Sequence, residues 1–350
     1  MGALAQHRRG GAQRRSLLKT LRVATCVLAG DVGGTKTNLA IYSVSGHGTL
    51  AVVREASFPS RDYAGLEPLV AAFLARDSER ISAAAFGIAG PVIDGAVQVT
   101  NLPWHVEAQG LGRAIGCSSV RLMNDLESTA YGALFVEAEN LLTLQAGQPR
   151  AGNRAVIAAG TGLGEAILFW DGTRYHPSPT EGGHADFGPR DAREDALCVY
   201  LRGRFGRVSY ERVCSGLGLQ HVFEFLADGC RRAVAPEVRA RMQHQDPSAV
   251  IGQLGLARSC ATCVEALDIF VSIYGAQAGN LALDTMSVGG LYIGGGMVTK
   301  LLPLVTAGPF MDAFRAKDPH RELLERIPVY VLLDPKTAQL GAAYAAAGLL

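Results

Sequence analysis

The stretch GDVGGTKTNLAIY, Gly30 to Tyr42, follows the apolar run VATCVLA and decides how the chain is read. It misses the phosphate-loop pattern G-x-x-x-x-G-K-[ST] by one residue, because Thr35 stands where the second glycine belongs. A phosphate loop leads into a helix, whereas the alternation that begins at Leu39 and Ile41 is that of a strand. The glycines are therefore predicted to form a hairpin between two strands.

The pattern around this hairpin is that of an α/β protein. Apolar segments at 22–30, 37–44 and 50–58 predict three strands in an antiparallel meander, and strands and helices then alternate up to residue 125. The segment NRAVIAAGTGLGEAILFWDGTRYH, residues 153–176, repeats the opening order of strand, glycine turn and strand. This repetition indicates an internal duplication.

Composition excludes several protein classes. The 350 residues, 48% apolar and 19% charged, suit a soluble protein of two domains, and no run approaches the roughly 20 apolar residues of a membrane-spanning helix. A net charge of +1 gives no reason to expect nucleic acid or a membrane as partner. The seven cysteines form no disulfide pattern and indicate a reducing compartment; Cys260 and Cys263 are predicted to pack in a helix rather than bind zinc.

Residues 1–22 are predicted to be a basic, disordered leader. The first 30 residues carry six basic and no acidic side chains, so the remainder has a net charge of about −5. The segment RRSLLK, 14–19, could also be a twin-arginine export signal, but its apolar part is short and is interrupted by Arg22. The leader is too short for a helix-turn-helix domain.

A set of motifs in one order carries a resemblance to a known family. These motifs are GDVGGT, TNLPW, MNDLE, AAGTGLGEA, EGGHADF, SYERVCSGLGL, SCATC, GGLYIGGGM and LGAAYA. The set resembles the bacterial-type glucokinase family, within the actin, hexokinase and sugar-kinase superfamily. It spans nearly the whole chain after about residue 23.

The resemblance implies an α/β fold of two ribonuclease-H-like (actin-like ATPase) domains with a central cleft. The small domain is expected at 23–125 plus 336–350 and the large domain at 126–335. The implied activity is cytoplasmic, ATP- and Mg²⁺-dependent phosphorylation of D-glucose at its 6-hydroxyl. No nucleic-acid or membrane partner is expected, and a homodimer is an option because members of the family are often dimers.

Asp125 is the candidate catalytic residue, since it follows the apolar strand VRLMN where side chains of an α/β sheet face a crevice. The Asn-Asp pair could equally cap the next helix, and spacing alone leaves both roles open. The resemblance implies that Asp125 accepts the proton of the attacking hydroxyl.

A hexose offers hydroxyls and no charge, so its site needs carboxylates and amides. The residues that match the sugar contacts of the family are Asn101, Asn124, Asp125, Glu181, His184 and Glu211. His184 alone could be a structural histidine, and Glu211 could be an ordinary glutamate in the first turn of a helix.

The resemblance places ATP between glycine turns, whose backbone N–H groups can bind anions. Gly33, Gly34 and Thr35 are expected to face the γ-phosphate, with Gly160, Thr161 and Gly162 opposite and Gly294, Gly295 and Gly296 near the adenosine. Asp31 is the candidate Mg²⁺ residue, through water, because this ion takes few protein carboxylates. Asp31 could instead stabilise the turn.

Three questions stay open at this stage. GTKTN and NDLES depart from the family pattern, which leaves the hexose (glucose, mannose or an amino sugar) and the donor (ATP or polyphosphate) undecided. A non-catalytic sugar-sensing regulator is the alternative from another class, although Asp125 favours an enzyme. Glu165, within an otherwise apolar strand, has no explanation from the sequence.

Overall fold

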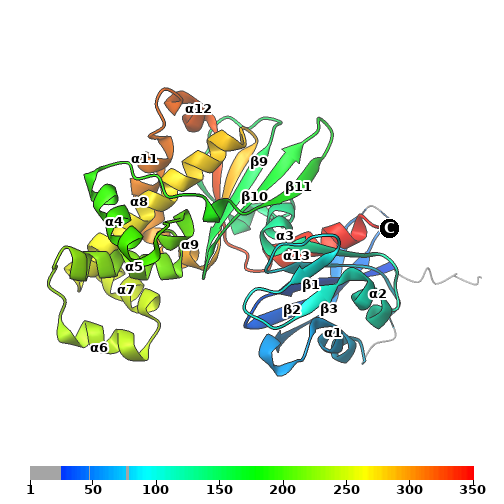
Figure 1. The fold of residues 1–350 in the computed structure, drawn as a ribbon. Helices are drawn as coiled ribbons and strands as arrows, with labels where there is room; N and C mark the ends of the chain where they lie inside the picture. Colours follow the sequence, from blue (N-terminus) through cyan, green and yellow to red (C-terminus); the bar gives the residue numbers. More distant parts are fainter. Residues whose placement is uncertain (1–24, 47, 76–78) are drawn as a thin grey trace, which may run out of the picture.

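Two β-sheets with helices on their faces make up the computed structural model, which describes residues 25–46, 48–75 and 79–350 (Figure 1). The predicted leader, 1–22, lies outside the described residues. Among those described, no helix combines the length and apolar character needed to cross a membrane.

The first sheet has the strand order β3-β2-β1-β4-β7. Its strands are β1 Thr25–Val32, β2 Lys36–Val44, β3 Leu50–Pro59, β4 Ile81–Ile88 and β7 Val120–Asn124. The first three form the predicted antiparallel meander, and β4 and β7 run parallel to β1. In the turn between β1 and β2 the Gly33 N–H donates to the Lys36 carbonyl at 3.0 Å, so the predicted hairpin is confirmed.

Helices cover both faces of this sheet. On one face, α1 (Leu66–Leu74) and α2 (Ala108–Ile115) bury an apolar core that includes Phe73, Phe86 and Trp104, beside the small β5 (Ala96–Gln98) and β6 (His105–Glu107) ladder. On the other face lies the alanine-rich α13, Thr337–Ala347.

The second sheet has the order β11-β10-β9-β12-β13-β8. Its strands are β8 Leu141–Gln145, β9 Arg154–Ala159, β10 Leu163–Trp170, β11 Tyr175–Thr180, β12 Gly290–Gly294 and β13 Val329–Leu332. β9, β10 and β11 repeat the antiparallel meander of the first sheet, and β12 runs parallel to β9 as β4 does to β1. The repetition predicted from residues 153–176 is therefore present in the topology.

The long helix α8, Ala261–Asp284, is the centre of the larger core. The remaining helices of this half are α4 Ala192–Phe205, α5 Gly216–Glu224, α6 Pro236–His244, α7 Pro247–Leu256, α9 Gly296–Lys300, α10 Leu302–Val305, α11 Pro309–Arg315 and α12 Arg321–Arg326. Cys260 caps α8 and Cys263 is buried within it, both as free thiols, which confirms their helical packing.

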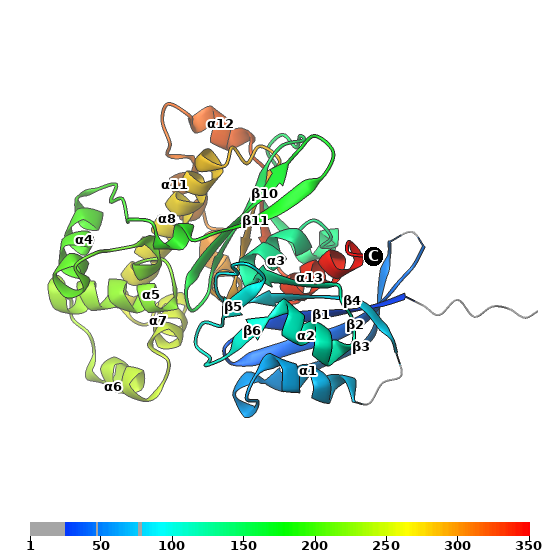
Figure 2. The same ribbon diagram turned by 45° about the vertical axis from the view of Figure 1, so that its right-hand side comes forward.

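Helices α3 (Asp125–Gly132) and α13 lie between the two sheets (Figures 1 and 2). They cross closely because Gly132 and Gly341 leave room for the backbone of the opposite helix. On the second sheet, Gly164 accommodates Leu126, whose side chain would lie 2.5 Å from a Cβ there. The first residue of α3 is Asp125, so its placement depends on both halves of the molecule. The exact domain boundaries stay a prediction.

Candidate active site

Asp31 and Asp125 lie near each other at the carboxyl ends of the parallel strands of the first sheet. Asp31 pairs with Gly87 of β4, which lies between β1 and β7, and Gly87 pairs with Met123 of β7, two residues before Asp125. A Cβ at position 87 would lie 2.7 Å from the Ser128 Cβ and 3.7 Å from the Asp125 Cα. Glycine at this position therefore lets α3 begin directly above the strand ends, with Asp31 and Asp125 on either side.

The two carboxylates and Glu181 share a negative electrostatic environment. Burial raises the pKa of Asp125 to about 6; the Leu126 N–H, which donates to its Oδ1 at 2.9 Å, opposes this rise, and the charges of Asp31 and Glu181 add to it. Burial also raises the pKa of Asp31, against the Asn38 amide that donates to its Oδ2 at 3.3 Å. A carboxylate with a pKa of about 6 is a stronger base than an ordinary one and is still ionised at neutral pH.

Asn124 is the helix cap that the sequence left undecided. Its Oδ1 accepts from the Leu126 and Glu127 N–H groups, and the Glu127 carboxylate accepts from the Asn124 N–H, which forms a capping box. Its Nδ2 donates to the Gly90 carbonyl at 3.0 Å. Both ends of the amide thus have partners within the chain, and a sugar contact of Asn124 stays a prediction.

Three predicted sugar residues converge on a pair of loops. Glu181 precedes the 3-10 turn Gly182–His184, His184 is its last residue, and Glu211 lies in the turn Tyr210–Arg212. The His184 imidazole lies between the carboxylates, with Nε2 4.0 Å from Glu181 Oε2 and Nδ1 3.9 Å from Glu211 Oε1. The Glu181 and His184 side chains are 62% and 56% exposed, so they are open to a ligand.

The glycine hairpins pack against predicted sugar residues. A Cβ at Gly34 would lie 3.2 Å from the Asn101 Cβ, and one at Gly162 would lie 2.5 Å from Glu211 Oε2. The same Glu211 oxygen accepts from the Leu163 N–H at 3.0 Å. Each of these two predicted phosphate turns thus contacts one predicted sugar-binding residue. Phosphate binding itself stays a prediction.

The third glycine turn borders an apolar cavity of about 180 Å³. Gly295 has a φ of 87° and packs on the backbone of Ala159, which brings this turn beside the β9–β10 hairpin. The cavity is lined by Leu219, Ser248, Ala249, Gly252, Gln253, Leu256, Met297, Lys300 and Leu301. The sequence missed these residues, because apolar helix positions look alike whether they face a core or a ligand.

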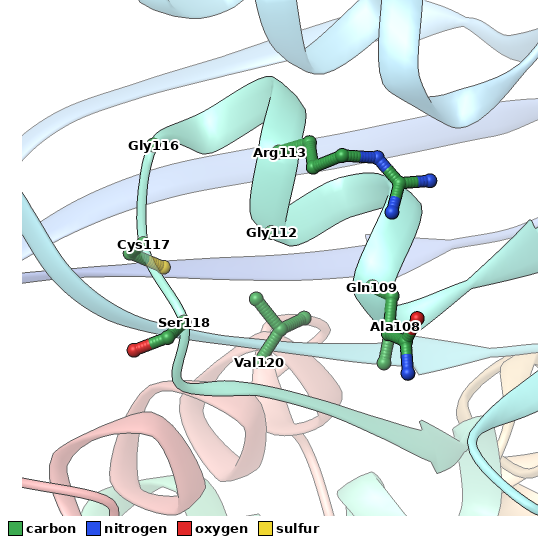
Figure 3. Close-up of a pocket in the computed structure, with 8 residues that line it drawn as sticks. All are labelled: Ala108, Gln109, Gly112, Arg113, Gly116, Cys117, Ser118 and Val120. Atoms are coloured by element: carbon green, nitrogen blue, oxygen red, sulfur yellow. The ribbon is translucent and has the colours of Figure 1, made fainter.

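A larger hollow, about 520 Å³, lies beside α2, away from the predicted site residues (Figure 3). Its lining runs along α2 and the following turn to Val120, at the amino end of β7. Asp125 follows the carboxyl end of the same strand. The hollow is therefore at the opposite end of β7 from the paired carboxylates.

Asp31 is the predicted metal residue, and the charge of Asp125 lies beside it. No group of three or more His, Cys, Asp or Glu residues within the described part of the chain could hold an ion by itself. Magnesium keeps several waters and commonly takes one or two carboxylates together with substrate phosphates. The Asp31 carboxylate, at the carboxyl ends of the parallel strands of the first sheet, is a ligand of the type that such an ion takes.

Comparisons with known proteins agree with this geometry. A family model described as glucokinase matches residues 28–349. The chain is 40% identical over 342 residues to a glucokinase of Nostoc sp., covering 93% of this chain and all of the relative, and 36% identical to one of Synechocystis sp., covering 91% and 97%. A crystal structure of a glucokinase from an Antarctic psychrotroph matches with a TM-score of 0.82 at 27% identity, over 92% of this chain and 99% of that one.

Proposed function

The chain belongs to the glucokinase family and is an ATP-dependent glucose kinase, and we propose that Asp125 is the general base of its reaction. The observation that carries this proposal is the half-buried Asp125 beside Asp31, with its pKa raised to about 6 by burial. Asp125 accepts the proton of the glucose 6-hydroxyl while the oxygen attacks the γ-phosphorus of ATP. The bond from that phosphorus to the bridging oxygen breaks, and the products are glucose 6-phosphate and ADP.

The acceptor site is the group formed by Glu181, His184 and Glu211, completed by Asn101 and Asn124. Carboxylates accept hydrogen bonds from sugar hydroxyls, and the imidazole of His184 can donate or accept. Holding glucose by several such groups orients its 6-hydroxyl toward Asp125, and orientation is a large part of what catalyses phosphoryl transfer.

The donor site is formed by the three glycine turns. Gly33, Gly34 and Thr35 face the γ-phosphate from one side and Gly160, Thr161 and Gly162 from the other, since N–H groups in such turns bind anions. The apolar cavity beside Gly294, Gly295 and Gly296 accepts the adenosine. Asp31 would hold Mg²⁺ through water, and this ion, when bound, would neutralise phosphate charge.

The experiment that tests this function is a coupled assay of ADP release with MgATP. It is run on glucose, mannose, fructose, N-acetylglucosamine and no sugar, with polyphosphate as a second donor. Turnover with glucose well above the other sugars is the expected result. Turnover with mannose or an amino sugar instead would correct the substrate, and glucose binding by calorimetry without turnover would favour a sugar-sensing regulator.

We also propose a cytoplasmic location. The free thiols of Cys117, Cys198, Cys214, Cys230, Cys260 and Cys263 support it, because reduced cysteines are typical of that compartment. Non-reducing electrophoresis of protein taken from cells under a thiol-blocking agent tests it.

A further inference from the structure

Glu165 is a buried carboxylate that the mechanism above does not use. It lies in β10, it is 3% exposed, and its side chain contacts Gln277 of α8. Burial raises its pKa to about 7, the Gln277 hydrogen bond lowers it, and the charge of Asp284 raises it. Burying an apolar side chain at this position would cost less free energy than burying a carboxylate, so a role for the carboxylate is expected.

The Glu165 carboxylate lies directly beneath the loop that carries Glu181 and His184. Its Oε2 occupies the space beside the Gly182 Cα that any larger residue would need for its Cβ. The Glu165 carbonyl accepts from the Thr180 hydroxyl at 3.2 Å, and the hydroxyl oxygen accepts from the Gly182 N–H at 3.2 Å. Residue 165 therefore contacts the start of the loop through its side chain and its main chain.

A chain of buried and part-buried hydrogen bonds leads from the other carboxylate oxygen. Gln277 donates to Glu165 Oε1 at 2.9 Å, and Asn280 donates to Gln277 Oε1 at 2.9 Å. The Asn280 amide also donates to the Tyr210 hydroxyl at 2.9 Å, while its oxygen accepts from Lys317. The network thus crosses α8 and ends at Tyr210.

Tyr210 belongs to the second sugar loop. It precedes Glu211, and its N–H donates to the carbonyl of Ala185, the residue after His184, at 3.0 Å. The polar network therefore reaches the loop of Glu181 at one end and the segment of Glu211 at the other. Directional hydrogen bonds fix such relative positions more exactly than apolar packing does.

We propose that Glu165 is a positioning residue of the sugar site, which acts through Gln277 and Asn280 to fix the Glu181–His184 loop relative to Glu211. The inference rests on the proposed hexose-binding role of those loops. It assigns Glu165 no contact with the substrate. Its effect is expected on sugar binding and not on ATP binding or the chemical step.

The first test compares Glu165→Leu with Glu165→Gln. In the leucine variant the KM for glucose should rise about threefold to tenfold, the size of one lost hydrogen bond, with kcat and the KM for ATP within about twofold of wild type. The glutamine variant, which keeps an oxygen for Gln277, should recover most of the affinity. A folded leucine variant with an unchanged KM for glucose, or with an equal rise in the KM for ATP, would overturn the proposal.

The second test uses the far end of the network, where loss of folding is less of a risk. Tyr210→Phe removes only a hydroxyl, and Tyr330→Phe on β13 is the matched control. Because both residues act through one network, Glu165→Leu and Tyr210→Phe should raise the KM for glucose together by clearly less than the product of their separate effects. Effects that multiply, or a Tyr330→Phe effect of equal size, would contradict the coupling.

Failure of the proposed function gives a different result from failure of this inference. If wild type turns over no sugar, the kinase assignment fails, and calorimetric glucose binding by the same variants still tests Glu165. If wild type phosphorylates glucose normally and the variants match its KM, only the role of Glu165 fails.

Discussion

Asp31 and Asp125 flank Gly87 from the two neighbouring strands, and the charge of Asp31 raises the pKa of Asp125. The pairing requires three parallel strands in register and a residue without a side chain on the middle one. In the proposed mechanism the two carboxylates have different roles, since one accepts a proton and the other holds a cation. Each residue can therefore be tested by its own substitution.

Asp125→Asn should lower kcat by on the order of 10²–10⁴, the range of general-base catalysis, and leave glucose binding nearly intact. The amide keeps the shape of the carboxylate but cannot accept the proton. Coupled-assay kinetics measure the first effect and calorimetry the second. Wild-type kcat in this variant would remove Asp125 from the mechanism.

The kcat/KM for glucose should be level near pH 7 and above and should fall about tenfold per pH unit below about pH 6. The base works only when ionised, and burial raises the pKa of Asp125 to about 6, so protonation below that pH removes activity. A pH profile of kcat/KM at saturating MgATP measures this. A level profile down to pH 5 would contradict the assignment of Asp125 as base.

Asp31→Asn should lower the pKa of Asp125 in the metal-free protein. The mutation removes a negative charge that raises this pKa, so the carboxyl should lose its proton at a lower pH than in wild type. Carboxyl NMR titration without metal measures the shift. The same variant should need a higher Mg²⁺ concentration for half-maximal activity, and an unchanged Mg²⁺ requirement would leave Asp31 without its proposed role.

The antiparallel hairpin at Gly30–Tyr42 was predictable because alternation is a local property of the sequence. β8 was not predicted, since its half-buried residues pair with β13 from the far end of the chain. The choice between Asn124 and Asp125 as helix cap depends on backbone angles that spacing does not encode. Glu165 could be noticed as unusual, but its partner Gln277 comes from another helix, so its surroundings needed the structure.

Gly87→Ala should destabilise the protein by about 1–3 kcal/mol and lower kcat, because the added methyl would lie 2.7 Å from the Ser128 Cβ and displace the start of α3. Gly203→Ala is the matched control: Gly203 lies within α4 and its Cβ would meet nothing within 4 Å. Thermal unfolding and kcat are measured on both. A Gly87→Ala enzyme equal to wild type would mean that α3 does not need this close contact.

Arg207→Ala should raise the KM for glucose severalfold without lowering the melting temperature. The Arg207 guanidinium donates to the His184 carbonyl, through Nη1 at 2.9 Å and also through Nη2, and its Nε lies 3.3 Å from Asp186. It therefore holds the backbone of His184 from the solvent side. Because its side chain is 58% exposed, its removal costs little stability.

Arg207→Lys separates the geometry of this contact from its charge. Lysine keeps the positive charge but loses the planar fork of donors, so the variant should resemble Arg207→Ala more than wild type. Arg204→Ala is the control, since Arg204 precedes it by three residues and pairs with Glu224 instead. If Arg204→Ala raises the KM equally, the effect belongs to surface charge and not to the position of His184.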